Sequence, residues 1–432
     1  MSELHITRDL LRAVTRGDVP SQALIEFGWK HLSSLCPICS EEFRFWRREL
    51  RLSHDSALKV MPALLKRHAI DEENRQADAE RDFRVLMKGS QEARLWKIDH
   101  SLKRFRGTLL ARRLLDESKK RMTANIDLAD NLAEAAGAVL LRTPESPGVT
   151  DLRALASVYR ANVARLRGRP DEARTWFKRA RSIIQMERAE DPLTTAETDS
   201  CEGVLALDLR QFEEAEGLLN RSVFLYLLAG AKGKAALPMV TLGHLYYEQG
   251  KLARSVETLR AALTMIDARA DRRLLMSARF NLAVCLCEAG HYSEATDALT
   301  DNRDLFQEFP EPFLQLRIAW LEARIAAGTG HPEVAEKGFL AVREEMARRG
   351  QGYDAAMVSL DLALIYLEQG RTGELLRLAE EMHALFRAEE VHREALAALL
   401  VFEEAARKEQ LSSEVIQSLS ALLKRVHQSP SS

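Results

Sequence analysis

The sequence predicts an all-α protein in which most of the chain forms an array of helical hairpins behind a small N-terminal helical module. Three observations predict this class. Glycines recur in 40-residue steps at Gly250, Gly290, Gly330 and Gly370, and Gly168 lies 82 residues before the first of them. Each of these glycines ends one helical apolar pattern and precedes another, as expected for the turn of a hairpin. With only 12 Pro and 21 Gly in 432 residues, long stretches can also stay helical.

The second helix of each hairpin carries a small side chain followed four residues later by a bulky one. The small side chains are Ala173, Ala215, Ser255, Ala295 and Ala335, and the bulky ones are Phe177, Leu219, Leu259, Leu299 and Phe339. Residues at i and i+4 lie on one helix face, so this pair predicts a close-packing point beside a filler. In the copy that contains Ala215, Arg210 takes the place of the turn glycine.

These features resemble the tetratricopeptide repeat (TPR) family over roughly residues 152–408. The resemblance is carried by Leu242-Gly243-His244-Leu245-Tyr246 together with Gly250 and Ala262. The usual TPR unit has 34 residues, so a 40-residue period implies that each helix is longer by most of a turn. The resemblance implies a right-handed superhelical solenoid that acts as a scaffold for proteins or binds peptides.

The rest of the chain divides around two breaks. Arg142-Thr143-Pro144-Glu145-Ser146-Pro147-Gly148 interrupts the helical pattern just before the regular array, and 71–76 is a polar junction. We therefore expect an N-terminal module over 1–50, a helical linker over 51–100, a hairpin over 101–142 and the solenoid over 150–428. The hairpin is expected to cap the array, because the first repeat must have its exposed face covered.

The resemblance also implies which residues form a binding surface, because the first helix of each TPR hairpin lines the concave face. The register is set by the small residues Ala161, Gly203, Gly243, Ala283, Ala323 and Ala363. The candidates beside them are Asn162, Arg165, Val204, Asp208, His244, Tyr247, Phe280, Val284, Arg317, Trp320, Arg324 and Leu364. Tyr247, Phe280 and Trp320 are the expected anchors, since aromatic side chains bury large areas at little entropic cost. The Lys/Asn set of a C-terminal carboxylate clamp is missing, which favours an internal or amphipathic segment as the ligand.

Near the N-terminus, three side chains have the spacing of a metal site. Cys36 and Cys39 form a Cys-x-x-Cys pair around Pro37, and His31 precedes them. Zinc prefers such thiolate and imidazole ligands. The segment resembles the zinc-binding anti-sigma domain, which implies zinc as a cofactor, His5 as a fourth ligand and a sigma factor as a partner. The family has three residues between His and the first Cys whereas this chain has four. Two alternatives to a zinc site therefore stay open. The segment is a remnant of such a domain that binds no metal, or Cys36 and Cys39 form a redox pair.

The metal prediction has a direct measurement. If the site holds zinc, the purified protein should contain about one equivalent, and Cys36→Ser with Cys39→Ser should remove it, because binding needs both thiolates. The metal content is measured by mass spectrometry after expression with zinc under reducing conditions. Metal-free protein with both thiols open to alkylation and the N-terminal module still folded would leave only the remnant.

Several function classes are excluded or disfavoured by the sequence. It contains no phosphate-binding glycine loop, nucleophile elbow or HExxH pair, so we expect no enzyme. A net charge of −2 makes nucleic acid an unlikely partner. The chain has neither a signal-peptide pattern nor an apolar run of about 18 residues, which predicts a cytoplasmic protein that does not bind membranes.

Two functions remain after these exclusions. The first is an adaptor that holds a peptide or a partner's helix in the concave groove of the solenoid. The second is a transcription regulator whose N-terminal module binds a sigma factor while the solenoid senses a signal or a partner. The first is preferred, because the repeat pattern covers far more of the chain than the zinc-type motif.

Overall fold

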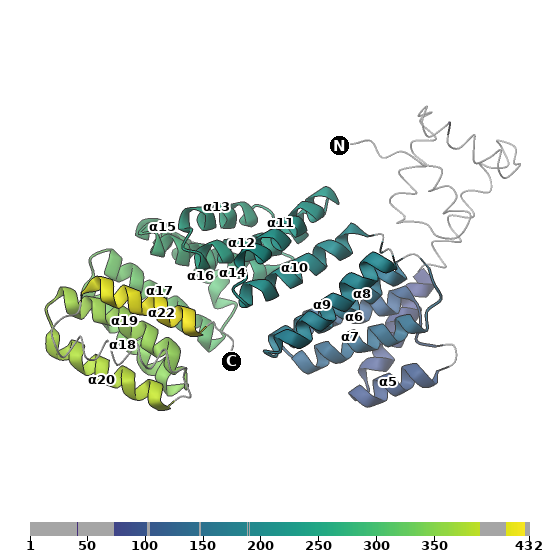
Figure 1. The fold of residues 1–432 in the computed structure, drawn as a ribbon, viewed down its shortest axis with the longest axis horizontal. Coiled ribbons are helices and arrows are strands. Elements are labelled where there is room, and N and C mark those ends of the chain that lie inside the picture. The colour runs from purple at the N-terminus through teal and green to yellow at the C-terminus, as the bar shows by residue number, and fades with distance from the viewer. Residues whose placement is uncertain are drawn as a thin grey trace, which may run out of the picture. The chain divides into compact units, whose positions relative to one another are not determined.

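The computed structural model describes Glu41 and residues 73–101, 104–146, 148–187, 189, 191–388 and 412–427. All regular secondary structure in these residues is helical, which confirms the all-α prediction (Figure 1). Of the predicted N-terminal module, only Glu41 is among them. The chain divides into two compact units, Met1–Tyr159 and Arg160–Ser432. The division falls within α8 (Val149–Leu166), a few residues into the predicted solenoid.

The first unit contains the helix 73–87, α5 (Gln91–His100), α6 (Thr108–Arg121), α7 (Ile126–Leu141) and the first part of α8. Helices α6 and α7 pack against each other as a hairpin within the predicted 101–142 segment. Apolar side chains of both helices are buried there, with Leu110, Leu114 and Leu132 at 1% exposure or less. Whether this hairpin caps the array stays a prediction.

The second unit is a succession of helices, and most of them pack against the helix that follows in the chain. The helices are α9 (Pro170–Met186), α10 (Pro192–Asp208), α11 (Phe212–Leu228), α12 (Lys232–Glu248), α13 (Leu252–Leu263), α14 (Arg272–Glu288), α15 (Tyr292–Thr300), α16 (Arg303–Gln307), α17 (Pro312–Gly328), α18 (Pro332–Arg348), α19 (Gly352–Glu368), α20 (Thr372–Ala388) and α22 (Ser413–His427). The hairpins α10/α11, α12/α13, α14/α15, α17/α18 and α19/α20 follow the predicted repeat.

The turns between the paired helices have the predicted backbone conformation. Gly168, Gly250, Gly290, Gly330 and Gly370 all have a positive φ between 68° and 80°, which a glycine adopts without steric cost. Arg210, the residue at the glycine position of its copy, has φ 56°. The structure therefore confirms both the turn positions and the equivalence of Arg210 to the glycines.

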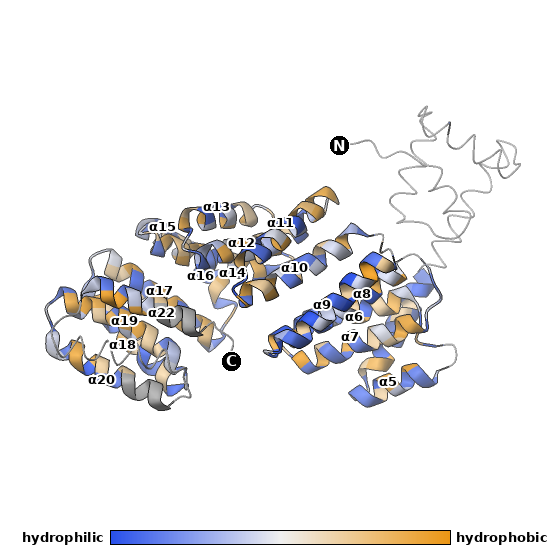
Figure 2. Ribbon diagram, in the orientation of Figure 1, coloured by the Kyte–Doolittle hydropathy of each residue, from blue (hydrophilic) through white to orange (hydrophobic). Residues whose placement is uncertain are grey.

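The helices pack at the small and bulky positions that the sequence singled out. All five small residues of the second helices are 0% exposed, and the bulky residues are at most 7% exposed. Polar residues share each helix with apolar ones, as expected for helices that are buried on one side (Figure 2). None of the helices in the described ranges is both long and apolar enough to cross a membrane.

Two second helices are shorter than the 40-residue period implied. Helix α13 has 12 residues and α15 has 9, whereas α11 and α18 each have 17. At the end of α13, the Thr264 hydroxyl donates to the carbonyl of Ala261 at 2.8 Å. After α15, the Asn302 side-chain amide donates to the carbonyl of Ala298 at 2.8 Å. These side chains bond to carbonyl groups in the last turns of the two shortened helices.

Candidate functional site

The first helices of the hairpins turn one small residue toward their second helix. Gly203 and Gly243 are buried, and a Cβ at either position would collide with Leu219 or Leu259 respectively. Residues on the other sides of these helices are therefore directed away from the hairpin interface. We use the name inner-face cluster, after the predicted concave face, for the interacting set His244, Tyr247, Arg317, Trp320 and Arg324 with the acids Asp208, Glu248, Glu288 and Asp361. The placement of this set on a concave face stays a prediction.

Acidic residues end three successive first helices, and each one bonds to a neighbouring repeat. Asp208 accepts from Arg165 Nη1 at 2.6 Å. Glu248 accepts from Arg210 Nη1 at 3.5 Å. Glu288 accepts from the Tyr247 hydroxyl at 3.2 Å and from Arg324 Nη1 at 3.0 Å. Consecutive repeats are thus joined by hydrogen bonds along this face, in addition to the contacts of the apolar core.

A second group of bonds joins α17 to α19. The Trp320 indole N–H donates to Asp361 Oδ2 at 2.6 Å, and Arg324 Nε lies 3.5 Å from the same oxygen. Burial alone lowers the pKa of Arg324, but Asp361 and Glu288 outweigh it and hold that pKa well above the ordinary value. Arg324 therefore stays charged between two carboxylates, and the orientation of Trp320 is fixed by its bond.

His244 and Tyr247 form a stacked pair on α12, with ring centroids 6.1 Å apart and an interplanar angle of 17°. The His244 side chain is 48% accessible, yet burial lowers the pKa of its imidazole. Glu248 and Asp208 oppose this change, and Arg317 on α17 reinforces it. Charged groups from α10, α12 and α17 therefore act together on this partly exposed pair.

Residues distant in the chain act on the surroundings of the same pair. Burial raises the pKa of Tyr247, with Glu288 adding to the effect. Burial also raises the pKa of Tyr353, in the first turn of α19, and Glu248 of α12 contributes there. The second unit thus brings side chains from α10, α12, α17 and α19 within electrostatic reach of one another.

The structure places the other predicted binding residues as follows. Asn162 Oδ1 accepts from Arg165 Nε at 2.8 Å, so these two lie together. Val204, Val284 and Leu364 are half-buried. Phe280 is only 5% exposed and lies beneath Arg317, so it supports that side chain instead of presenting its own ring. Ligand contact at all of these positions stays a prediction.

Sequence reasoning missed three acids of the cluster, which are Glu248, Glu288 and Asp361. The signal for two of them was present, because Asp208, Glu248 and Glu288 are spaced 40 residues apart. Asp361 had no such signal, since the equivalent positions in the preceding repeats are Leu321 and Asn281. Acidic residues on a helical repeat are usually solvent-exposed, so only the contacts between repeats reveal the roles of these three.

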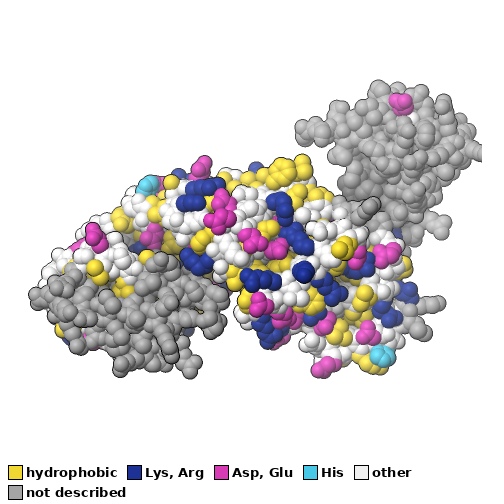
Figure 3. All heavy atoms as spheres, in the orientation of Figure 1, with side chains coloured by type: hydrophobic (Ala, Val, Ile, Leu, Met, Phe, Trp, Pro, Cys, Tyr) yellow, Lys and Arg dark blue, Asp and Glu magenta, His cyan; other side chains and the backbone are white. Residues whose placement is uncertain are grey.

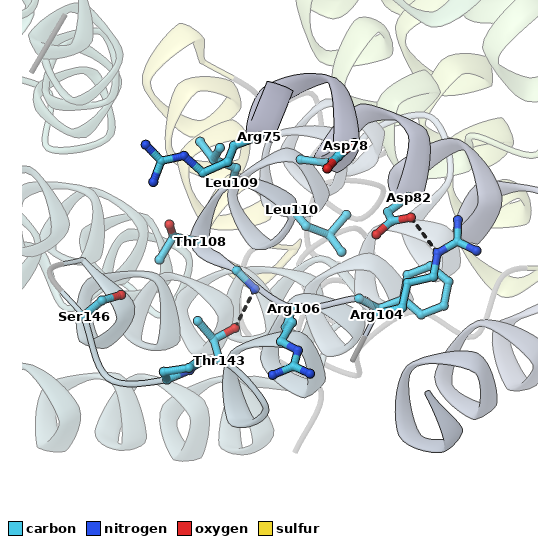
Figure 4. A pocket seen from close by; sticks show the side chains of 14 residues that line it. Arg75, Asp78, Asp82, Arg104, Arg106, Thr108, Leu109, Leu110, Thr143 and Ser146 are labelled. Atoms are coloured by element: carbon cyan, nitrogen blue, oxygen red, sulfur yellow. Dashed lines mark hydrogen bonds and ion pairs between the residues drawn. The ribbon is translucent and has the colours of Figure 1, made fainter. Parts of the chain in front are cut away.

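The first unit contains a hollow of about 720 Å³ beside the helix 73–87 and the loop before α6 (Figure 4). Charged side chains of both signs line it, and Arg104 Nε pairs with Asp82 Oδ1 at 2.7 Å. The backbone N–H of Gly107 donates to the Thr143 hydroxyl at 2.8 Å. The mixture of paired charges selects no single class of ligand, so the inner-face cluster is the stronger candidate.

Charges of both signs are also intermixed over the described surface in the view of Figure 3. That face offers no broad basic region for a nucleic-acid backbone within the described residues. His5, His31, Cys36 and Cys39 lie outside the described residues. The zinc site and the sigma-factor partner therefore stay predictions.

The hairpin array and its inner-face cluster define a TPR-like helical-repeat protein. A Rap protein complexed with competence and sporulation factor has a similar structure, with a TM-score of 0.54 and 13% identity over 74% of this chain and 87% of that chain. The match to a signal transduction ATPase with numerous domains and a TPR sensor, from Pyrococcus horikoshii, has a TM-score of 0.52 and 12% identity over 73% of this chain. It spans 47% of that longer protein. At these identities the likeness concerns the fold.

No protein-family model matches the sequence, and no curated protein matches it.

Proposed function

We propose that this protein is a non-enzymatic interaction scaffold that binds a peptide or a partner's helix at the inner-face cluster. The observation that carries the proposal is the stacked, partly exposed pair of His244 and Tyr247, together with Trp320, whose indole is held by Asp361. Partly exposed aromatic side chains with fixed orientations are typical anchors of protein interfaces. Side chains that are already fixed in this way lose little conformational entropy when a ligand packs on them.

The fold comparisons support this proposal. The similar Rap protein was solved as a complex with competence and sporulation factor, and the similar ATPase is described as having a TPR sensor. Both are helical-repeat proteins in roles of binding or sensing. The likeness reaches only the fold, so the ligand of this chain must be found by experiment.

The proposal is tested with a randomised peptide library, which is displayed on phage and panned on the immobilised full chain. Enriched peptides are then synthesised, and their Kd values are measured by fluorescence anisotropy. Trp320→Ala and Tyr247→Ala should each weaken binding by roughly 30-fold, corresponding to an anchor that contributes about 2 kcal/mol. Trp320→Phe keeps the aromatic area but loses the bond to Asp361, so it should weaken binding less.

Trp96→Ala is the matched control, because Trp96 is an exposed tryptophan of the first unit. It should leave every Kd unchanged. Peptides that bind the Trp320→Ala and Tyr247→Ala variants as tightly as the parent protein would place the binding surface elsewhere. The absence of any enriched peptide would contradict the proposed function itself.

A further inference from the structure

Arg317, on α17, differs from the other arginines that border the inner-face cluster. Arg165, Arg210 and Arg324 each pair with an acid of a neighbouring repeat, at 2.6, 3.5 and 3.0 Å respectively. Arg317 makes no ion pair or hydrogen bond with any side chain among the described residues. Its guanidinium lies instead over aromatic rings, 5.1 Å from the centroid of Phe280 and 5.9 Å from that of Phe313.

This arrangement orients the guanidinium and leaves its donors free. Phe280, from α14, is 5% exposed and fixed in the core, and Phe313 lies in the first turn of α17 with 42% exposure. Stacking on aromatic rings occupies the flat faces of an arginine, whereas its N–H groups point outward in the plane. Arg317 itself is exposed, so a ligand can reach those N–H groups.

The repeat architecture does not require an arginine at this position. The equivalent residues, at 40-residue spacing, are Glu197, Leu237, Ser277 and Met357. A glutamate, a leucine, a serine and a methionine therefore occupy this position in other copies of the same hairpin. Arg317 is thus a local feature of one repeat, next to the part of the array where the anchors lie.

Arg317 also lies within electrostatic reach of the stacked pair of His244 and Tyr247. Its charge acts on His244 of α12, although α14 separates the two helices in the chain. The acids of the cluster are already bonded, because Asp208, Glu248, Glu288 and Asp361 accept from arginine, tyrosine or tryptophan donors. At this end of the cluster, Arg317 is therefore the charged residue whose hydrogen-bond donors remain available to a ligand.

We propose that Arg317 donates hydrogen bonds to a carboxylate of the bound ligand, so that the scaffold selects peptides or helices carrying an acidic group beside an aromatic or apolar anchor residue. The inference rests on the proposed function and specifies its ligand class. A planar guanidinium with two adjacent N–H groups matches a carboxylate in a bidentate manner, which a lysine would not reproduce. The carboxylate comes from an aspartate or glutamate side chain or from the C-terminus of the ligand.

The experiment repeats the library selection on three full-length proteins: the parent, Arg317→Gln and Arg317→Glu. Peptides selected by the parent should share an acidic residue or a free C-terminus, and they should bind Arg317→Gln about 10- to 100-fold more weakly. Selection on Arg317→Glu should instead enrich lysine or arginine. Amidated and free-acid versions of each peptide, and versions with Asp→Asn or Glu→Gln, distinguish the two sources of the carboxylate.

A double-mutant cycle separates a direct contact from a general loss of charge. Neutralising the ligand carboxylate should weaken binding to the parent protein and leave binding to Arg317→Gln unchanged. Arg273→Gln is the matched control, because Arg273 lies over Phe309 at 5.2 Å but is already paired with Glu311. It should bind the peptides like the parent.

Two results would overturn the inference, and they are distinguishable. Peptides that require Trp320 and Tyr247 but bind Arg317→Gln with unchanged Kd would refute the carboxylate site and leave the proposed function in place. A selection that enriches no peptide on the parent protein would refute both. Thermal unfolding of each variant, followed by circular dichroism, confirms that the comparison is made between folded proteins.

Discussion

Gly243→Leu is expected to lower the free energy of unfolding of the second unit. The expected loss is at the upper end of the ~1–3 kcal/mol that is typical of an overpacked core, or above it. A Cβ on Gly243 would lie 2.5 Å from Leu259 Cγ and 2.7 Å from its Cδ2. Leu259 is 0% exposed, so its side chain cannot turn out into solvent without leaving the core. At the same contact, the Ser255 hydroxyl donates to the Gly243 carbonyl at 2.6 Å, so separating α12 from α13 would also break a buried hydrogen bond.

The measurement is chemical denaturation followed by circular dichroism, with hydrogen exchange to locate the change. Exchange should increase in α12 and α13 before other helices, because contacts in a repeat array are local. Gly217→Ala is the control, since Gly217 lies within α11 and a Cβ there meets nothing within 4 Å. That substitution should stabilise the protein by about 0.5–1 kcal/mol. An unchanged unfolding midpoint for Gly243→Leu would contradict the repeat register.

Replacing Arg181 and Arg221 together by methionine is expected to cost about 3–5 kcal/mol, the range found when a buried charge loses its partners. Asp199, on α10, is 0% exposed. It accepts two hydrogen bonds from Arg221 of α11, at 2.5 and 2.6 Å, and one from Arg181 of α9 at 2.5 Å. Methionine keeps much of the apolar contact of each arginine stem while removing both cations from the carboxylate.

A third substitution tests whether the loss comes from the unpaired carboxylate. Adding Asp199→Leu to the double variant should restore much of the lost stability, because replacing buried charges together by apolar residues is often neutral. Glu202, which also accepts from Arg181, remains in this variant but is 25% exposed and can be hydrated. Arg260→Met is the exposed control, as Arg260 pairs with Glu294 on the surface and should contribute about 0–1 kcal/mol. The free energies are compared by denaturation as above. A double variant as stable as the parent would show that Asp199 has other means of solvation.

The repeat architecture could be predicted because its signals are local. A turn glycine such as Gly250 needs a positive φ whatever surrounds it, and Ser255 and Leu259 share a helix face because of the helical period alone. The 40-residue recurrence then aligned the copies and identified Arg210 as the residue that replaces a glycine. The sequence alone therefore determined the helix class, the turns and the packing register of most hairpins.

The tertiary structure decided which charged residues matter. Asp199 and Glu288 have the residue type and spacing of exposed helix positions, yet one is buried between two arginines and the other links Tyr247 to Arg324. Trp320 lies 41 residues from its acceptor Asp361, so their bond depends on how consecutive hairpins stack. Helical period determines which face a side chain occupies, but the partner on that face is set by the packing angle between helices. That angle arises from the summed contacts of the whole array, which no local pattern encodes.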